Sequence, residues 1–428
     1  MSRWYYWVSG FFMLDAIQAF GFIDTLVYPP WDGKPGDKIT QTLNLLLILA
    51  SLALFVRSLR TGKGVRAGAV LALSAIAFLF LTALWSMDPG TTIREAVVYL
   101  FVVIGAIGIA GTLGADEFMD LLSLTCFLSA IASLVLLVVS PKTAFLADQT
   151  NFQGIFAYKN VLGQVMAIGA LASLHTIRVG NRRRARNFFM LFVFAGIAFV
   201  SKSTTSLMTV FAFCGVDGII TLYRRGGAAR TLGVVFAIAL VPILVVGAAD
   251  PDLMLDLIGK DPTLTGRTEI WGYVMDDISL KPLLGWGYFA FWIASNPAAV
   301  EIGNAVHWVV PEAHNGLLEM LLNVGMVGTA IFAFLLIRNV VLAFQCLRTS
   351  ATDLAISTIL CCGGILLVGI SETVLLAPTQ SSTPVFFVTG LMCEQALWAA
   401  KRRRYRLRPR DYTSVPLAKS ATGIAKVG

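Results

Sequence analysis

The feature that most limits what this chain can fold into is its series of long apolar segments. Residues 68–86, "GAVLALSAIAFLFLTALWS", carry no charged side chain. About 20 apolar residues in a helix cross a bilayer, and because these runs are continuous rather than alternating, they do not fit the strands of a membrane barrel. Only 14% of the residues are charged and 57% are hydrophobic, whereas a soluble domain carries more charge. The chain is therefore predicted to be an all-α integral membrane protein.

Segments of this kind predict about twelve transmembrane helices. They cover 8–28, 40–56, 68–86, 95–112, 118–140, 160–177, 188–201, 204–223, 231–249, 313–337, 352–376 and 383–400. The first is interrupted by Asp15 and Asp24. Because "MSRWYYWVSG" has little positive charge and no small-residue cleavage site follows, this segment is expected to stay in the protein rather than be removed as a signal peptide.

The basic residues fall unevenly on the two sides of these spans. Of 33 Lys and Arg residues, 24 lie on the side of the two termini and nine on the other. The positive-inside rule then places both termini in the cytoplasm. Because the net charge of +8 reflects this topology, no nucleic-acid partner is needed, and the tail "KRRRYRLRPR" is expected to meet anionic lipid headgroups. None of the six cysteines falls on the external side, so neither a disulfide nor a cysteine metal site is expected.

One connection between spans is long. Residues 250–312 form an external segment, and connections of this length are usually functional. The predicted organisation is nine helices in 1–249, an external cap in 250–312, three helices in 313–400 and a basic cytoplasmic tail in 401–428.

The external cap contains a predicted amphipathic helix at 265–282, "TGRTEIWGYVMDDISLKP". Its apolar side chains recur at three- and four-residue steps, and its acidic residues lie elsewhere on the helical wheel. The apolar set is Ile270, Trp271, Val274, Met275 and Ile278. We expect this helix to lie along the outer surface and cover a cavity.

Four basic residues on the external side run against the topology rule. Arg267 opens the cap helix, Lys159 lies at the outer end of the sixth span, Lys202 at the tip of a hairpin, and Arg94 before the fourth span. Ionisable groups at membrane depth are costly and tend to mark functional sites. If they face one cavity, these cations form an anion receptor. In the alternative interpretation, each extends singly to headgroup phosphates.

His314 and Asn315 lie at the start of the tenth span, on the outer side. The exposed N–H groups and dipole of a helix N-terminus disfavour added positive charge, which favours a neutral imidazole able to accept a proton. In the alternative interpretation, Asn315 only caps the helix and His314 is an interface residue. His175, at a cytoplasmic helix end, and His307, in the external segment, have no comparable setting and no role is assigned to them.

A divalent metal is a further alternative. Asp250 and Asp252, with Asp256 beyond, resemble the acidic pairs that hold such ions, but pairs of this kind are also common in solvated loops. No metal and no cofactor is expected.

As an ordered set, five stretches resemble the O-antigen ligase and polysaccharide polymerase superfamily, and most closely its exopolysaccharide-production polymerases. They are "FAYKNVLGQ", "SKSTTSL", "TGRTEIW", "KPLLGWGYFAFW" and "HNGLLEMLLNVGMVG". The resemblance covers roughly residues 150–340. It implies a GT-C-type, metal-independent membrane glycosyltransferase of the bacterial inner membrane, with its active site facing the periplasm.

The resemblance also implies the substrates and their site. The donor is an oligosaccharide on undecaprenyl pyrophosphate, the acceptor is a glycan hydroxyl, His314 is the base, and Arg267 binds the pyrophosphate. Lys202 stands where the family often has arginine; lysine offers a point charge rather than a two-pronged contact. Lys159 and Arg94 are assigned to the same anion. Asn160, Trp271, Asn315 and Glu319, with Glu372, are expected to line the substrate cavity.

The predicted chemistry is an inverting transfer, because the base and the cations would lie on opposite sides of the anomeric carbon. Pyrophosphate is a good leaving group, so cations suffice to stabilise it. Two other functions stay open. One is a ligase that passes the glycan to a lipid A core; the other is a twelve-helix secondary transporter, which the late external loop disfavours. Chain-length regulators and export proteins are the further partners that the resemblance suggests.

Overall fold

The computed structural model describes residues 4–16, 19, 37–61, 66–145, 151–180, 183–235, 267–378 and 380–407. Within these ranges, helix is the only regular structure apart from one isolated bridge between Phe145 and Phe152. The helices with defined bounds are α1 (Trp4–Ala16), α3 (Asp37–Thr61), α4 (Ala67–Leu81), η2 (Thr82–Leu84), α5 (Pro89–Thr112), α6 (Ala115–Val139), α7 (Pro141–Ala144), α8 (Lys159–Val179), α9 (Arg184–Val200), α10 (Thr204–Arg225), α13 (Arg267–Leu280), α14 (Pro297–Ala305), α15 (Gly316–Cys346), α16 (Thr352–Gly369) and α17 (Ser382–Leu407). The predicted all-helical class is confirmed.

Eight helices in the described ranges are long and apolar enough to cross a membrane. They are Thr42–Thr61, Ala67–Leu84, Pro89–Thr112, Ala115–Val139, Lys159–Val179, Thr204–Arg225, Gly316–Cys346 and Thr352–Gly369, and each coincides with a predicted span. Helices α9 and α17 occupy two further predicted spans but are not among the eight. The predicted spans 8–28 and 231–249 extend outside the described residues. The fold is that of an integral membrane protein, and the number twelve stays a prediction.

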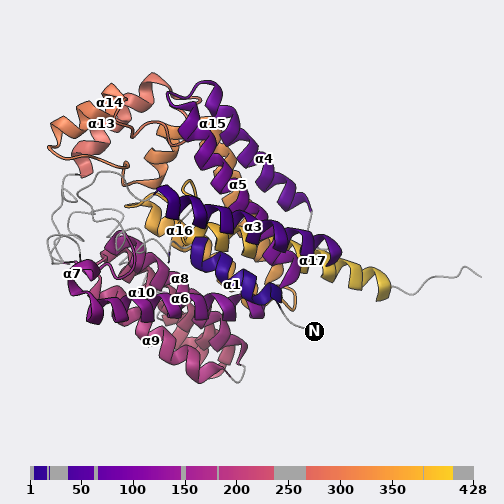
Figure 1. Cartoon of the computed structure of the whole chain (residues 1–428). Coiled ribbons are helices and arrows are strands. Elements are labelled where there is room, and N and C mark those ends of the chain that lie inside the picture. The colour runs from indigo at the N-terminus through magenta and orange to yellow at the C-terminus, as the bar shows by residue number, and fades with distance from the viewer. Residues whose placement is uncertain are drawn as a thin grey trace, which may run out of the picture.

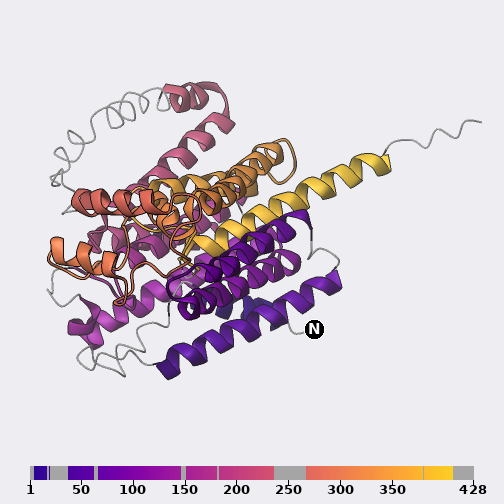
Figure 2. The ribbon, with the colours of Figure 1, turned by 90° about the horizontal axis from the view of Figure 1, so that it is seen from above.

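The helices form an elongated bundle with different structures at its two ends (Figure 1). Helices α13 and α14 lie at one end, and the C-terminal part of α17 projects from the other. The view from above shows the same separation (Figure 2). The candidate site described below lies at the end that carries α13 and α14.

Helix α3 packs closely on α5 because α5 presents glycines where the two meet. A Cβ atom on Gly108 would lie 2.6 Å from the Cβ of Leu54, and one on Gly111 would lie 2.4 Å from the Cβ of Ser58. Inside a bilayer the hydrophobic effect does not drive helices together, so close packing at small residues is a main source of helix association. These glycines therefore fix the spacing of the pair.

Helix α15 is broken at Gly325, whose φ of 63° is outside the helical region. The break leaves backbone N–H and C=O groups of α15 without hydrogen-bond partners in the helix, and the backbone of residues 282–287 provides those partners. The N–H of Met326 donates to the carbonyl of Pro282 at 2.9 Å, and that of Trp286 donates to the carbonyl of Leu322 at 2.8 Å. Irregular backbone inside a membrane helix is tolerated where protein groups satisfy it in this way. The part of the external cap that follows α13 is thereby anchored in the middle of α15.

The amphipathic helix predicted at 265–282 is present as α13, Arg267–Leu280. Ile270 and Val274 are buried, as its periodicity predicts, and pack in a small core with residues of the cap and of α15. Met275, which was assigned to the same apolar face, is 57% exposed. The buried face is therefore narrower than the sequence indicates.

Helix α8 connects the two ends of the bundle. At one end its first turn holds Asn160, and at the other its last turn holds Arg178. Its 21 residues span roughly 30 Å. Arg178 pairs with Asp217 of α10 and donates to the hydroxyl of Ser357 of α16 at 2.6 Å. These contacts hold three helices together at the end opposite the candidate site.

Candidate functional site

The loop before α15 holds His314 in a left-handed backbone conformation, with φ of 50°. Two hydrogen bonds fix the preceding residue. The N–H of Ala313 donates to the carboxylate of Glu319 at 2.7 Å, and its carbonyl accepts from the indole of Trp271 at 3.0 Å. A positive φ is uncommon outside glycine and persists where the surroundings impose it. Helices α13 and α15 thus set the position of the imidazole.

Asn315 caps α15. Its side-chain oxygen accepts from the N–H groups of Leu317 at 3.0 Å and Leu318 at 3.1 Å. Its amide also donates to the carbonyl of Ile370 at 3.3 Å. The interpretation that Asn315 caps the helix is therefore confirmed. The bond from its amide to Ile370 also connects the loop that holds His314 to the end of α16.

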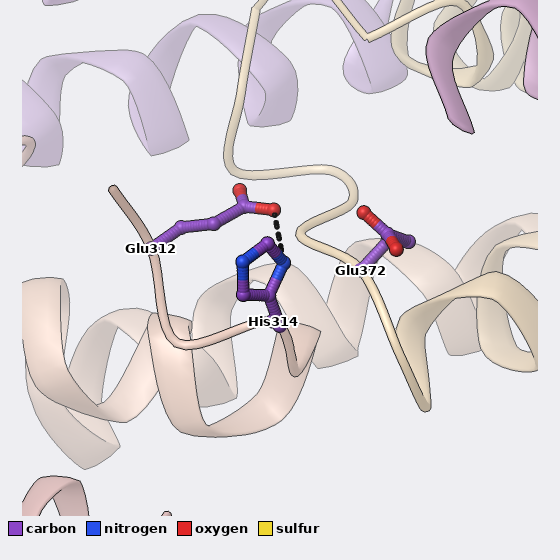
Figure 3. Close-up of side chains that lie close together, drawn as sticks. All are labelled: Glu312, His314 and Glu372. Atoms are coloured by element: carbon purple, nitrogen blue, oxygen red, sulfur yellow. Dashed lines mark ion pairs between the residues drawn. The ribbon is translucent and has the colours of Figure 1, made fainter. Parts of the chain in front are cut away.

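Two glutamates lie beside His314. Oε1 of Glu312 is 3.2 Å from Nδ1 of His314, and Glu372 reaches toward the same imidazole from the connection between α16 and α17 (Figure 3). One ligand-type atom from each of the three residues lies within 4.8 Å of the others. A divalent cation could bind between these three side chains. Arg267, which forms an ion pair with Glu372, already supplies a positive charge there.

Arg267, the first residue of α13, contacts the other side of this group. Its Nη2 lies 3.2 Å from Oε1 of Glu372, and its Nη1 donates to the carbonyl of Ser371. The amide of Asn160, in the first turn of α8, donates to the same Glu372 oxygen at 2.7 Å. Glu372 therefore joins α13 and α8 next to the imidazole.

The two glutamates differ in how readily they hold a proton. Burial raises the pKa of Glu312, but interactions with His314 and Arg267 outweigh it, so this pKa lies below the ordinary glutamate value. For Glu372, burial and the nearby charge of Glu312 raise the pKa, although Arg267 and His314 oppose them. Titratable neighbours whose pKa values are pushed apart are typical of acid–base sites.

The other predicted cations lie at varying distances from this group. Lys159 is adjacent to Asn160 and donates to the side-chain oxygen of Asn151 at 3.0 Å. Lys202 is exposed at the turn between α9 and α10 and has a φ of 55°. The hydroxyl of Thr205, at the start of α10, hydrogen-bonds to that of Ser371 at 2.7 Å. Because Ser371 adjoins Glu372, this turn lies near His314 and its two glutamates. Arg94 is 69% exposed and pairs with Glu95. No contact in the described ranges links Arg94 to His314 or Arg267.

Glu319, predicted to line the substrate cavity, makes contacts that hold the loop before α15. Its carboxylate is buried and accepts from the Ala313 N–H, the Trp292 indole and the Asn323 amide. Trp271 likewise acts through its bond to Ala313. Sequence reasoning did not find Glu312. The signal was an acidic residue two positions before the histidine in "PEAHN". Asp250, Asp252 and Asp256 lie outside the described residues.

Comparison with known proteins relates part of this chain to one family. Residues 188–333, which include Arg267 and His314, match the O-antigen ligase family profile. This part of the chain is similar to the O-antigen ligase family. The matched residues run from α9 through the first half of α15 and include the external cap and the loop that holds His314.

Two curated relatives are similar over part of the chain. One is the exopolysaccharide production protein ExoQ of Rhizobium meliloti, 28% identical over 282 residues. That alignment covers 61% of this chain and 62% of the relative. The other, from Rickettsia felis, is named "Putative polysaccharide ligase" and is 26% identical over 166 residues, or 36% of this chain and 38% of that protein. This chain therefore spans less than two thirds of either relative.

Proposed function

We propose that this protein is a membrane glycosyltransferase that polymerises glycan repeat units for an exopolysaccharide. The donor is an oligosaccharide on undecaprenyl pyrophosphate in the outer leaflet of the inner membrane, and the acceptor is a hydroxyl of another glycan. One observation carries the proposal: a histidine with a carboxylate partner and a partly buried arginine share the neighbour Glu372 at one end of a membrane-helix bundle. The family match and the name of the Rhizobium meliloti relative support a role in polysaccharide synthesis.

In the proposed reaction, Nε2 of His314 takes the proton of the acceptor hydroxyl as its oxygen attacks the anomeric carbon. The bond from that carbon to the pyrophosphate oxygen breaks, and its electron pair leaves with the pyrophosphate. Attack opposite the leaving group inverts the anomeric configuration. Glu312 at Nδ1 stabilises the imidazolium that forms, as a carboxylate does in other histidine-base sites.

Arg267 is the proposed pyrophosphate ligand. Arginine matches phosphate oxygens with two parallel hydrogen bonds, and here it is held at 20% exposure next to the base. A pyrophosphate must compete with Glu372 for this guanidinium. The raised pKa of Glu372 assists the exchange, because a protonated glutamate releases arginine more easily than an ionised one. Lys159 and Lys202 are proposed to add positive charge from the neighbouring helix ends, and Arg94, which pairs with Glu95, is proposed as a more distant member of the set.

The proposal is tested by transfer assays on purified full-length protein with a lipid-linked donor. His314→Ala is expected to lower kcat by about 10²- to 10⁴-fold, the range that general-base catalysis supplies. The matched control is Leu317→Ala, since Leu317 is 58% exposed on the adjacent turn and is expected to leave kcat unchanged. Wild-type rates in His314→Ala would remove the base from the mechanism.

The arginine is tested separately. Arg267→Glu is expected to abolish donor binding and Arg267→Lys to weaken it, because lysine keeps the charge but not the paired contact. Unchanged donor affinity in Arg267→Glu would exclude the anion site. Release of undecaprenyl pyrophosphate during turnover separates an enzyme from a transporter, since transport leaves the carrier linkage intact.

A ligase is the second candidate, because the matched family is the O-antigen ligases. Both reactions use the same donor site and differ in the acceptor, which is a lipid A core for the ligase. Deleting the gene and sizing the surface glycan distinguishes them. Loss of long chains is expected for the polymerase, whereas full-length chains that stay unattached would indicate the ligase.

A further inference from the structure

A cavity of about 510 Å³ lies in the cap next to the histidine loop. It is formed by the turn after Phe291, by α14 and by the segment 307–310, and its lining includes Trp292, Asn304, His307 and Trp308. Small-molecule sites usually measure roughly 300–1,000 Å³, so the volume suits a ligand. The proposed reaction assigns no role to this cavity.

Both tryptophans of the cavity connect it to the proposed catalytic loop. The ring of Trp308 stacks on the imidazole of His314, with centroids 6.1 Å apart and planes inclined by 29°. The indole of Trp292 donates to the carboxylate of Glu319 at 3.1 Å, and that carboxylate also holds the N–H of Ala313. A molecule bound against Trp308 is therefore one aromatic ring away from the proposed base.

The lining chemistry suits a neutral sugar. A pyranose presents C–H groups on its faces and hydroxyls around its edge, so it pairs with an aromatic face and with amide or imidazole groups. Trp292 and Trp308 supply the faces, and Asn304 and His307, both exposed, supply donors and acceptors. Among the described residues lining the cavity there is no Lys, Arg, Asp or Glu, so an anion such as pyrophosphate finds no charged partner there.

The location favours a sugar over a prenyl chain. The lining residues lie between 292 and 310, ahead of the spanning helix that starts at Gly316 and outside all eight candidate spans. The prenyl tail of the donor is expected in the bilayer, because transferring its apolar surface from water into lipid is favourable. The donor's pyrophosphate is assigned to Arg267, which contacts Glu372 rather than the tryptophans.

We propose that this cavity is the acceptor subsite, in which one neutral pyranose of the acceptor glycan stacks on Trp308 and holds the adjoining sugar unit so that its hydroxyl reaches His314. The inference rests on the proposed function and extends it to a second binding site. It also gives His307 a role, although the sequence assigned it none.

The test uses a substitution that fills the cavity without touching the catalytic loop. Ala294 is exposed and lines the cavity, whereas its neighbour Ser295 is exposed and does not. In transfer assays, Ala294→Trp is expected to raise the KM for the acceptor about tenfold or more and to leave the KM for the donor unchanged. Ser295→Trp, the matched control, is expected to leave both unchanged. An unchanged acceptor KM in Ala294→Trp, or a raised donor KM in its place, would overturn the assignment.

Direct binding separates this inference from the proposed reaction. Saturation-transfer NMR with methyl β-D-glucopyranoside and methyl β-D-galactopyranoside needs no turnover. We expect signals from at least one glycoside with the wild type, with Ser295→Trp and with catalytically impaired His314→Ala, and their loss with Ala294→Trp. If neither glycoside gives a signal, or if farnesol gives one that Ala294→Trp removes, the cavity is not a sugar site. A sugar signal without any transfer would instead remove the proposed function and keep the subsite.

Discussion

His314 has a carboxylate on each side, and the two are not equivalent. Glu312 has a lowered pKa, so its ionised form stabilises the fold above the pKa of the unfolded chain, and that contribution is lost as pH falls through the folded value. Glu372 has a raised pKa, so its neutral form is favoured; its contribution is greatest at low pH and is lost as pH rises through the folded value. Glu312 is therefore the more readily ionised of the two carboxylates beside the imidazole.

Replacing Glu312 tests this asymmetry. Glu312→Gln keeps the shape but removes the charge that stabilises the imidazolium, so kcat is expected to fall about 10- to 100-fold, less than for His314→Ala. Transfer rates, with Glu301→Gln as an exposed control on α14, provide the check. An unchanged kcat in Glu312→Gln would show that Glu312 does not act on the imidazolium.

Individual site residues could be predicted only where one sequence stretch contains them. Arg267, His314 and Asn315 each lie in a stretch that carries the family resemblance, and their positions near one another agree with it. Glu312 is two residues from His314, but the left-handed turn at His314 decides where its carboxylate points, and that turn depends on bonds from Trp271 and Glu319. No local pattern contains this long-range information.

Among the helices, the break in α15 has the greatest consequence for the site. The part of α15 before Gly325 carries Glu319 and the Asn315 cap, and the segment 282–287 pairs with the break. The position of the loop that holds His314 therefore depends on how residues 282–287 of the external cap pair with the break in α15. Gly325 makes this possible, because a Cβ atom there would lie 2.4 Å from the carbonyl carbon of Leu283.

Gly325→Ala is predicted to destabilise the protein and to lower activity. With φ of 63° and ψ of −170°, Gly325 lies in a backbone region that is essentially restricted to glycine and costs other residues roughly 1–3 kcal/mol, and the steric conflict with Leu283 adds to this cost. Gly363→Ala is the matched control, since Gly363 is helical in α16 with nothing within 4 Å of an added Cβ, and a Gly-to-Ala change in a helix stabilises by about 0.5–1 kcal/mol. Melting temperatures in detergent, with transfer rates, decide the outcome. Equal stability of the two variants would contradict the insertion argument.

The apolar runs and the 3.6-residue period were enough to predict where most helices lie. The spans predicted at 95–112, 160–177 and 204–223 agree closely with α5, α8 and α10. The break in α15 was not predictable in this way, because "LLNVGMVG" is apolar on both sides of the glycine and glycines are frequent in membrane helices. Its cause lies in the backbone of residues 282–287, which precede α15 by about thirty positions.

At the scale of the whole molecule, the two ends of the bundle have different chemistry. Helices α13 and α14 lie at one end, and the C-terminal part of α17 projects from the other (Figure 1). Asn160, which contacts Glu372 of the site, lies in the first turn of α8, whereas Arg178, which pairs with the buried Asp217, lies in its last turn. Helix α8 contributes to both ends and is the most enclosed of the candidate spans, with 89% of its most apolar window buried. Such an enclosed helix gives the site a rigid support.

The uneven distribution of basic residues predicts which end faces out. With 24 of 33 on the side of the termini, the end that holds His314 is expected to face the periplasm. Cysteines introduced singly test this, because five of the six native cysteines are buried. A membrane-impermeant maleimide is expected to label Val309→Cys, whose parent residue is 89% exposed, in intact spheroplasts. Lys401→Cys is expected to react only after permeabilisation. The opposite pattern would place His314 in the cytoplasm, away from any donor in the outer leaflet.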